Sequence, residues 1–170
     1  DGTYVRLHDP GGATVTVAPI PPDYPRVTPY LSVDGAADAI DFYVSALGAT
    51  QRGDRMTMPD GRIGHAELQF GDAVVMLADA FPDQDFIDPR ALGGSPVTLH
   101  LYVEDVDAVF AAAVAAGAEQ LKPVSTEFYG DRSGKFRDPW GHIWNVATHV
   151  EDVAPDEMER RAREAMGGAG

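Results

Sequence analysis

Two imidazoles and one carboxylate are the side chains in this sequence best suited to binding a metal or transferring a proton. His65 and Glu67 are separated by one residue in the run GHAELQF, so they share one face if that run is a strand. His100 lies in a second alternating run, VTLHLYV. Nothing in the sequence fixes the distance from His100 to the other two. We therefore favour a hydrogen-bonded set that lines a polar cavity, with a metal site or acid-base catalysis as the alternative.

An internal repeat organises the elements that must position these side chains. Residues 27–49 align with residues 97–118, and the first strands match at a constant offset of 70 (97 minus 27). Each copy has an alternating strand, an acidic turn that can cap a helix, an amphipathic helix and a terminating glycine. Strand-like runs separated by turn signals follow each helix. The sequence therefore predicts an α+β fold of two tandem βαβββ modules, at about residues 27–80 and 97–150.

The two ends lie outside the repeat. Segments 3–8 and 14–18 flank Asp9-Pro10-Gly11-Gly12, which predicts a hairpin within an N-terminal extension spanning residues 1–26. Residues 153–170 are expected to form a C-terminal helix, with Pro155 in its first turn, or a mobile tail.

Three stretches, in order, carry a family resemblance. VTPYLSVDGAADAIDFYVSALGA, GHAELQFGDAVVMLAD and FYGDRSGKFRDPWGHIWNVATHVED resemble the PhnB-like branch of the vicinal oxygen chelate superfamily, the glyoxalase, bleomycin resistance protein and dioxygenase group. The resemblance implies a glyoxalase-like domain over residues 27–152, in which the modules form a cup-shaped mixed sheet. It implies far less about function, because one fold hosts many chemistries.

Metal-dependent relatives take their ligands from four cup-facing positions, one on the first and one on the last strand of each module. The resemblance carries these positions onto Thr28, Met76, Thr98 and Asn145. Hydroxyl, thioether and amide groups alone hold a divalent ion weakly. The usual metal centre, and enediolate chemistry with it, is therefore expected to be absent. A divalent metal at a non-standard site formed by His65, Glu67 and His100 stays open, and no other cofactor is implied.

Strand alternation predicts which side chains face the cup. If Ala66, Leu68 and Phe70 pack beneath the helices, the residues between them face the opposite way, and the same argument applies to the other strands. The expected ligand-binding set is Thr28, Tyr30, His65, Glu67, Met76, Thr98, His100, Tyr102, Tyr129, Arg132 and Asn145.

Tyr129 and Arg132 belong to this set because a similar aromatic-Gly-Asp-Arg stretch borders the cavity in PhnB-like proteins. Tyr129 could stack on a flat ligand, and Arg132 could pair with an anionic group. For Arg132 we favour the alternative of an internal ion pair with Asp131 or Asp138. The turn from Asp138 to His142 is expected to be geometric.

Charge and composition restrict the partners. The formal net charge of -14 repels phosphate backbones and anionic lipids, so neither nucleic acid nor a membrane surface is expected to bind. The chain has no cysteine, which excludes disulfides and thiol nucleophiles and is consistent with a cytoplasmic protein. No apolar stretch approaches the roughly 20 residues that span a bilayer, and residues 1–10 lack the layout of a secretory signal.

Three functions follow from these observations. The first is a metal-free protein that binds a small, partly aromatic molecule in the cup, as bleomycin resistance relatives bind their drug. The second is an enzyme of the lyase, isomerase or dioxygenase type that uses His65, Glu67 and His100, with or without a metal. The third is an assembly role with a vestigial cup. Relatives often pair two chains, so the resemblance also implies a homodimer.

Overall fold

The computed structural model describes residues 5–8 and 14–167. The first module contains β3 (Tyr30–Val33), α1 (Ala36–Leu47), β4 (Thr50–Thr57), β5 (Ile63–Phe70) and β6 (Ala73–Asp79). The second contains β7 (Thr98–Tyr102), α2 (Val106–Ala115), β8 (Glu119–Thr126), β9 (Asp131–Arg137) and β10 (Ile143–His149). The predicted α+β class and the tandem βαβββ modules are confirmed.

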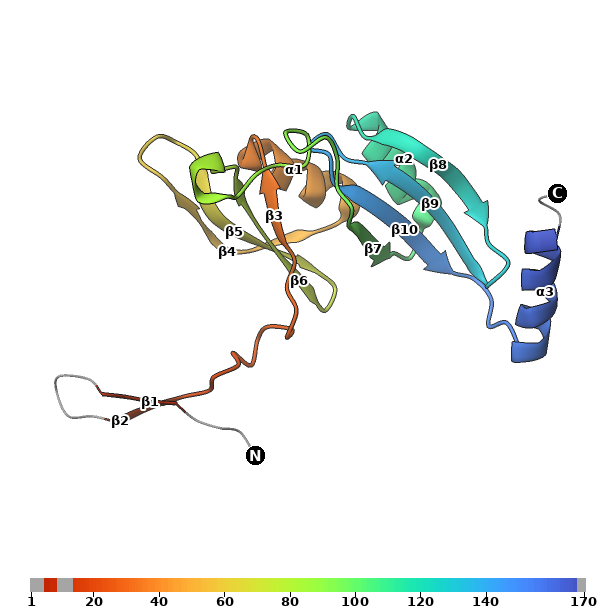
Figure 1. Ribbon diagram of the computed structural model, residues 1–170, viewed down its shortest axis with the longest axis horizontal. Helices are drawn as coiled ribbons and strands as arrows, with labels where there is room; N and C mark the ends of the chain where they lie inside the picture. Colours follow the sequence, from red (N-terminus) through yellow and green to blue (C-terminus); the bar gives the residue numbers. More distant parts are fainter. Residues whose placement is uncertain (1–4, 9–13, 168–170) are drawn as a thin grey trace.

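Each module builds its own four-stranded mixed sheet (Figure 1). The strand orders are β3-β6-β5-β4 and β7-β10-β9-β8. In both sheets the first strand pairs in parallel with the last, and the other pairs are antiparallel. The two predicted sets of cup-facing residues therefore lie on two separate sheets.

The helices begin and end at identifiable residues. Gly48 ends α1 in the left-handed conformation, with φ of 73°, and its backbone N–H bonds to the carbonyl of Tyr43. Asp105 caps α2 by accepting a hydrogen bond from the N–H of Ala108. The expected acidic cap is absent from α1. Its first amides instead donate to Asp79 of β6, so a strand residue distant in sequence caps this helix.

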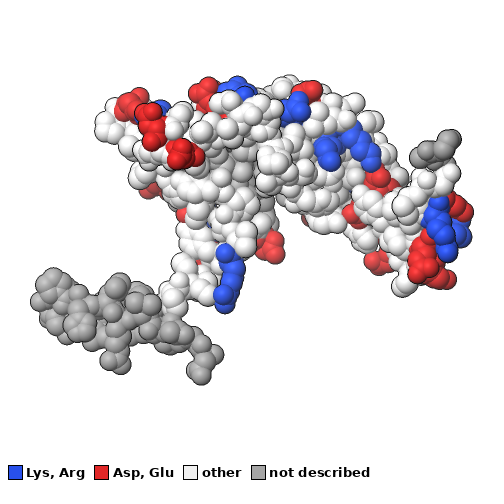
Figure 2. Space-filling view, viewed as in Figure 1, with Lys and Arg blue, Asp and Glu red and all other residues white. Residues whose placement is uncertain are grey.

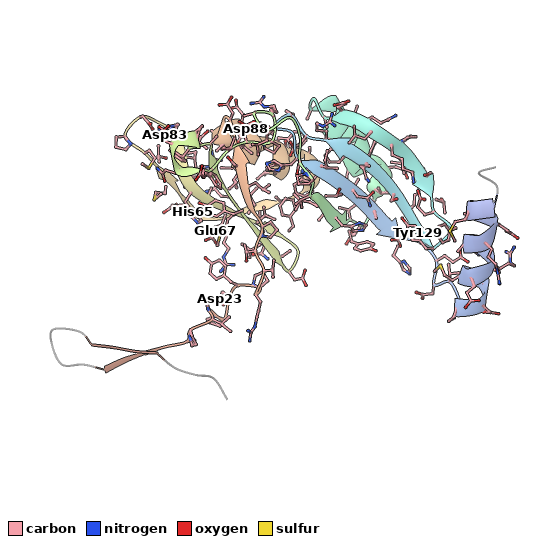
Figure 3. The ribbon with its side chains drawn as sticks, in the orientation of Figure 1. Asp23, His65, Glu67, Asp83, Asp88 and Tyr129 are labelled. Carbon is pink, nitrogen blue, oxygen red and sulfur yellow. The ribbon has the colours of Figure 1, made fainter. Side chains whose placement is uncertain are left out.

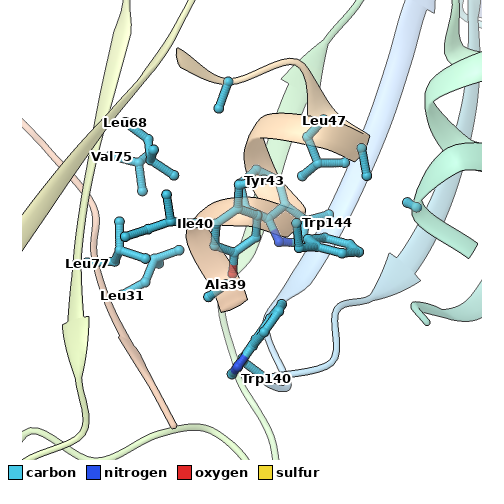
Figure 4. Packing of buried hydrophobic residues seen from close by; sticks show 14 of the residues in the cluster. Leu31, Ala39, Ile40, Tyr43, Leu47, Leu68, Val75, Leu77, Trp140 and Trp144 are labelled. Atoms are coloured by element: carbon cyan, nitrogen blue, oxygen red, sulfur yellow. The ribbon is translucent and has the colours of Figure 1, made fainter. Parts of the chain in front are cut away.

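The hydrophobic core lies where α1 packs on the first sheet and against α2 (Figure 4). In β5 the buried residues Ala66, Leu68 and Phe70 alternate with half-buried polar ones, as the alternation predicts. Trp140 and Trp144 from the second module reach into this core. At the junction, the buried Asp138 accepts hydrogen bonds from the Tyr43 hydroxyl and the Trp144 indole. One core therefore joins the two modules.

The ends and the linker add further elements. β1 (Val5–His8) pairs with β2 (Thr14–Val17) in an antiparallel hairpin, and its predicted turn, Asp9 to Gly12, lies outside the described residues. The linker contains the short helix η1 (Pro82–Gln84). α3 (Pro155–Gly167) stands at the opposite end of the molecule from the hairpin (Figure 1) and buries no side chain. None of the described helices is long and apolar enough to cross a membrane.

Candidate functional site

A row of side chains crosses the face of the first sheet that is opposite α1. Met76 of β6 pairs with Tyr30 on one side and with Glu67 on the other, and Glu67 pairs in turn with Arg52 of β4. His65 lies two residues from Glu67 on the same face of β5. Strand pairing therefore assembles an aromatic, a thioether, an imidazole and a carboxylate on one surface.

Hydrogen bonds join these side chains into one network. The Nδ1 atom of His65 lies 2.8 Å from the hydroxyl oxygen of Tyr30, and its Nε2 atom lies 3.2 Å from Glu67 Oε1. Figure 3 shows His65 and Glu67 side by side on this sheet. Tyr24, from the lead-in to β3, donates a 2.6 Å hydrogen bond to the same carboxylate. Glu67 therefore has three partners, because Arg52 Nε also approaches within 3.5 Å.

The network changes the acidity of its members. The hydrogen bond from Tyr24 lowers the pKa of the Glu67 carboxyl, and His65 and Arg52 lower it further. Burial, together with the charge of Glu67, raises the pKa of Tyr30. Near neutral pH the site therefore holds an ionised carboxylate beside an un-ionised phenol.

An open pocket of about 390 Å³ lies beside this network. Tyr30 forms one wall, and its ring meets the edge of Phe86 with ring centroids 5.2 Å apart. The lining is mostly aromatic and thioether: Tyr30, Met56, Met58, Gly64, Ala78, Phe81, Gln84 and Phe86. The site therefore combines an apolar cavity with one polar edge, which is the usual layout of a small-molecule pocket.

Gly64 and the linker shape this pocket. A Cβ atom on Gly64 would lie 2.7 Å from Met56 Cε and 2.9 Å from Met58 Sδ, so the bare glycine lets both side chains lie across β5. The linker folds back over the sheet through a bridge between Phe81 and Phe86. The sequence pattern gave no indication of Met56, Met58, Phe81 or Phe86 as pocket residues. Alternation says which face of a strand is apolar, whereas it carries no signal for how a loop closes over a sheet.

Ser32 adds a buried polar group on the same face of β3 as Tyr30. Its cross-strand neighbour Ala78 lines the pocket. Ser32 is 7% exposed, and its hydroxyl has no hydrogen-bond partner among the described residues.

The other predicted residues lie on the second sheet. His100 pairs across the strands with Asn145, whose amide nitrogen lies 3.1 Å from the imidazole Nδ1. Thr98 and Tyr102 are exposed on the same face. His100 also lines a smaller, mostly apolar pocket of about 180 Å³ between the modules. Among the described residues, no hydrogen bond or ion pair joins His100 to His65 or Glu67, and no group of three or more His, Cys, Asp or Glu side chains could hold a metal.

The strand register shows which residues lie beside Met76 and Asn145, two of the four positions that the family resemblance assigns to metal ligands in relatives. Met76 pairs with Tyr30, and Asn145 pairs with His100, so the paired positions lie two residues after Thr28 and Thr98. Thr28 precedes β3 and donates its hydroxyl to the carbonyl of Pro25. A phenol, a thioether, one imidazole and an amide are as poor a donor set as the one expected. The residues present do not fit the usual metal centre.

Tyr129 and Arg132 lie away from the pocket. Figure 3 places Tyr129 beside α3, at the other end of the molecule from His65 and Glu67. Arg132 forms an ion pair, but its partner is neither of the expected aspartates. Two nitrogens of its guanidinium each lie 2.7 Å from an oxygen of Asp107 at the start of α2. Asp131 instead accepts a hydrogen bond from Tyr102 and is hydrogen-bonded to His149. Asp138 is hydrogen-bonded to Tyr43 and Trp144 in the core.

The fold is that of a known superfamily. The model of the Glyoxalase/Bleomycin resistance protein/Dioxygenase superfamily matches residues 24–146. The chain belongs to this superfamily. An uncharacterized protein of Mycobacterium tuberculosis is 41% identical over 157 residues, which cover 91% of this chain and 89% of that protein.

Solved structures agree with this assignment. The structure of an Arabidopsis thaliana gene product is 28% identical, covers 73% of this chain and 98% of its own, and has a TM-score of 0.58. A PhnB protein from Bacillus cereus is 20% identical, with coverage of 73% and 99% and a TM-score of 0.56. The latter likeness shows the fold alone.

Proposed function

We propose that the protein binds a small, partly aromatic molecule in the pocket of the first module, without the help of a metal. The observation that carries this proposal is the cavity of about 390 Å³, in which aromatic rings and two methionines surround one polar edge. Its size lies within the range of roughly 300–1,000 Å³ typical of ligand pockets. Methionine side chains adapt to irregular apolar shapes, and the charge of -14 favours a neutral or cationic ligand over an anion.

A thermal-shift and NMR screen of flat aromatic compounds tests this proposal. A ligand at about 100 times its Kd stabilises the folded state by about 2.7 kcal/mol, or about 5 to 10 °C in a chain of this size. Met56→Lys places a charge in the pocket wall and should abolish the shift. Met166→Lys makes the same change on α3, where Met166 is 72% exposed, and should leave the shift unchanged. If no aromatic compound stabilises the protein, or if Met56→Lys responds like the wild type, the proposal fails.

An enzyme of the lyase, isomerase or dioxygenase type is the second candidate. The chain from Tyr30 through His65 to Glu67 favours it, because a carboxylate that orients an imidazole is a common acid-base device. Two facts weigh against it. First, the Nδ1 atom of His65 is already hydrogen-bonded to the hydroxyl of Tyr30. Second, the raised pKa of Tyr30 makes its phenol harder to deprotonate, so Tyr30 is poorly suited to act as a base.

Metal analysis separates the two candidates. Protein purified without chelator or metal affinity should contain no stoichiometric transition metal, and its melting temperature should not change with EDTA. One equivalent of metal per chain, lost together with stability on chelation, would overturn metal-independent binding and favour the enzyme.

A homodimer would cover the pocket with the second sheet of another chain. The row Tyr30, Met76, Glu67 of the first sheet corresponds in strand pairing to the row His100, Asn145, Lys135 of the second. Basic side chains are visible over the second sheet in Figure 2, and Lys135 holds the place that Glu67 holds in the first sheet, so this position carries opposite charges on the two sheets. Sedimentation should give the mass of two chains. Lys135→Glu should weaken the dimer, whereas Arg163→Glu on α3 should not, and a monomer at micromolar concentration would refute this arrangement.

Membership of the PhnB-like branch and a cytoplasmic location are parts of the same proposal. The branch is supported by the motifs around Tyr129 and Trp140, and the location by the absence of cysteine. Cell fractionation of the tagged protein tests the location.

A further inference from the structure

The geometry points to a ligand that presents an N–H or O–H group to the hydroxyl oxygen of Tyr30. This inference rests on the proposed function and adds the polarity of the ligand to it. The specificity of the pocket is set by the hydrogen bonds that run from Glu67 through His65 to Tyr30, because they make the Tyr30 hydroxyl an acceptor toward the pocket.

This series of hydrogen bonds starts at Glu67. An ionised carboxylate has acceptor sites and no donor. The carboxylate of Glu67 accepts from the Tyr24 hydroxyl at 2.6 Å and lies 3.5 Å from Arg52 Nε, so two independent partners favour the ionised form. Glu67 therefore requires a donor from every group that approaches it.

His65 passes this requirement on to Tyr30. A neutral imidazole has one donor nitrogen and one acceptor nitrogen. Because Nε2 faces the carboxylate of Glu67 at 3.2 Å, Nε2 carries the hydrogen and Nδ1 keeps a lone pair. The Tyr30 hydroxyl lies 2.8 Å from that Nδ1 and must donate to it. The other acceptor within reach, the carbonyl of Gly64, is 3.5 Å away, at the limit of a hydrogen bond.

The Tyr30 oxygen consequently meets the pocket with its lone pairs only. Tyr30 is 45% exposed and lines the pocket, so a ligand can reach it. Among the lining side chains, only Gln84 also carries a polar group, and its amide both donates and accepts. Tyr30 is therefore the lining group that distinguishes a donor from an acceptor, and a ligand that offers only acceptor atoms would leave its lone pairs desolvated.

Indole and benzofuran test this rule as a matched pair, since they share a shape and differ by an N–H donor in place of an ether oxygen. NMR titration of the full chain should show indole binding about 3- to 10-fold more tightly, the range of one net hydrogen bond. In Tyr30→Phe the two affinities should agree within about 2-fold. Tyr129→Phe removes a hydroxyl at the other end of the molecule, beside α3, and should keep the preference.

Each outcome decides between two ideas. Binding of both probes with equal affinity, or a preference that persists in Tyr30→Phe, would overturn the donor rule and leave the proposed pocket standing. Binding of neither probe would overturn both. The nitrogen chemical shifts of the His65 imidazole provide an independent measurement: a hydrogen on Nε2 is expected, and a hydrogen on Nδ1 would refute the inference.

Discussion

Removing one hydroxyl at the junction of the modules should destabilise the whole fold. Tyr43 is fully buried in α1 and donates a 2.6 Å hydrogen bond to Asp138 Oδ2 in the second module. In Tyr43→Phe this oxygen keeps only the indole N–H of Trp144, at 2.9 Å. A hydrogen bond to a charged group contributes about 1.5–3 kcal/mol, so the melting temperature should fall by about 3 to 12 °C. The ring stays, so the packing of α1 changes little.

Calorimetry with a matched control measures this effect. Tyr129→Phe removes a hydroxyl that makes no hydrogen bond with the described residues, and its stability should change by less than about 0.5 kcal/mol. Burial, and next the charge of Asp138, raises the pKa of Tyr43 well above its ordinary value. The folded state thus favours the neutral phenol, and this contribution is complete below about pH 10 and declines as the pH rises further.

The wild type should therefore lose its advantage over Tyr43→Phe above about pH 10. Equal melting temperatures of the wild type and Tyr43→Phe at neutral pH would refute the assignment of Asp138 as the joint between the modules. So would two separate melting transitions in the wild type, because a single shared core predicts one.

Two further substitutions test the site and the end of the second sheet. Gly64→Ala places a Cβ atom 2.7 Å from the flexible end of Met56, which should swing into the pocket and weaken indole binding in NMR titration while the fold persists. Hydrogen bonds to Asp131, and then to Asp152, raise the pKa of His149. Its contribution to stability is complete below about pH 6.5 and is lost as the pH rises through the folded pKa. His149→Gln should therefore lower the melting temperature more at acidic than at alkaline pH.

The sequence predicted the modules because their cause is local. Alternation in a strand and the period of a helix are set by neighbouring residues, so β5 was assigned together with its buried and half-buried faces. Alternation also grouped His65 with Glu67 correctly, since both lie on one strand. It grouped His100 with them on the assumption of a shared cup, whereas His100 belongs to the other sheet. Which face a side chain occupies is local information, but which sheet it meets depends on how the modules pack.

The contacts that define the site could not be predicted from the sequence for a related reason. Tyr24 bonds Glu67 across 43 residues, and the bridge from Phe81 to Phe86 lies in a segment that the sequence marks only as a linker. The partner of Arg132 shows the same limit. Either of two aspartates near it in sequence was expected to pair with it, but the guanidinium pairs with Asp107, which α2 brings close. Charge pairing was predictable, whereas the choice among several carboxylates is decided by the packing of elements.

Comparison of the two modules shows what distinguishes the surroundings of the first sheet from those of the second. The position of Glu67 beside Met76 is held in the second sheet by Lys135 beside Asn145. An ammonium group has donors only, so it cannot fix an imidazole as Glu67 does. The linker that closes the first pocket also has no counterpart after β10, where the described chain runs on to α3. The two modules have similar sheets, but Glu67 gives the first sheet a polar edge, and the linker that contains Phe81 and Phe86 forms a wall of its pocket.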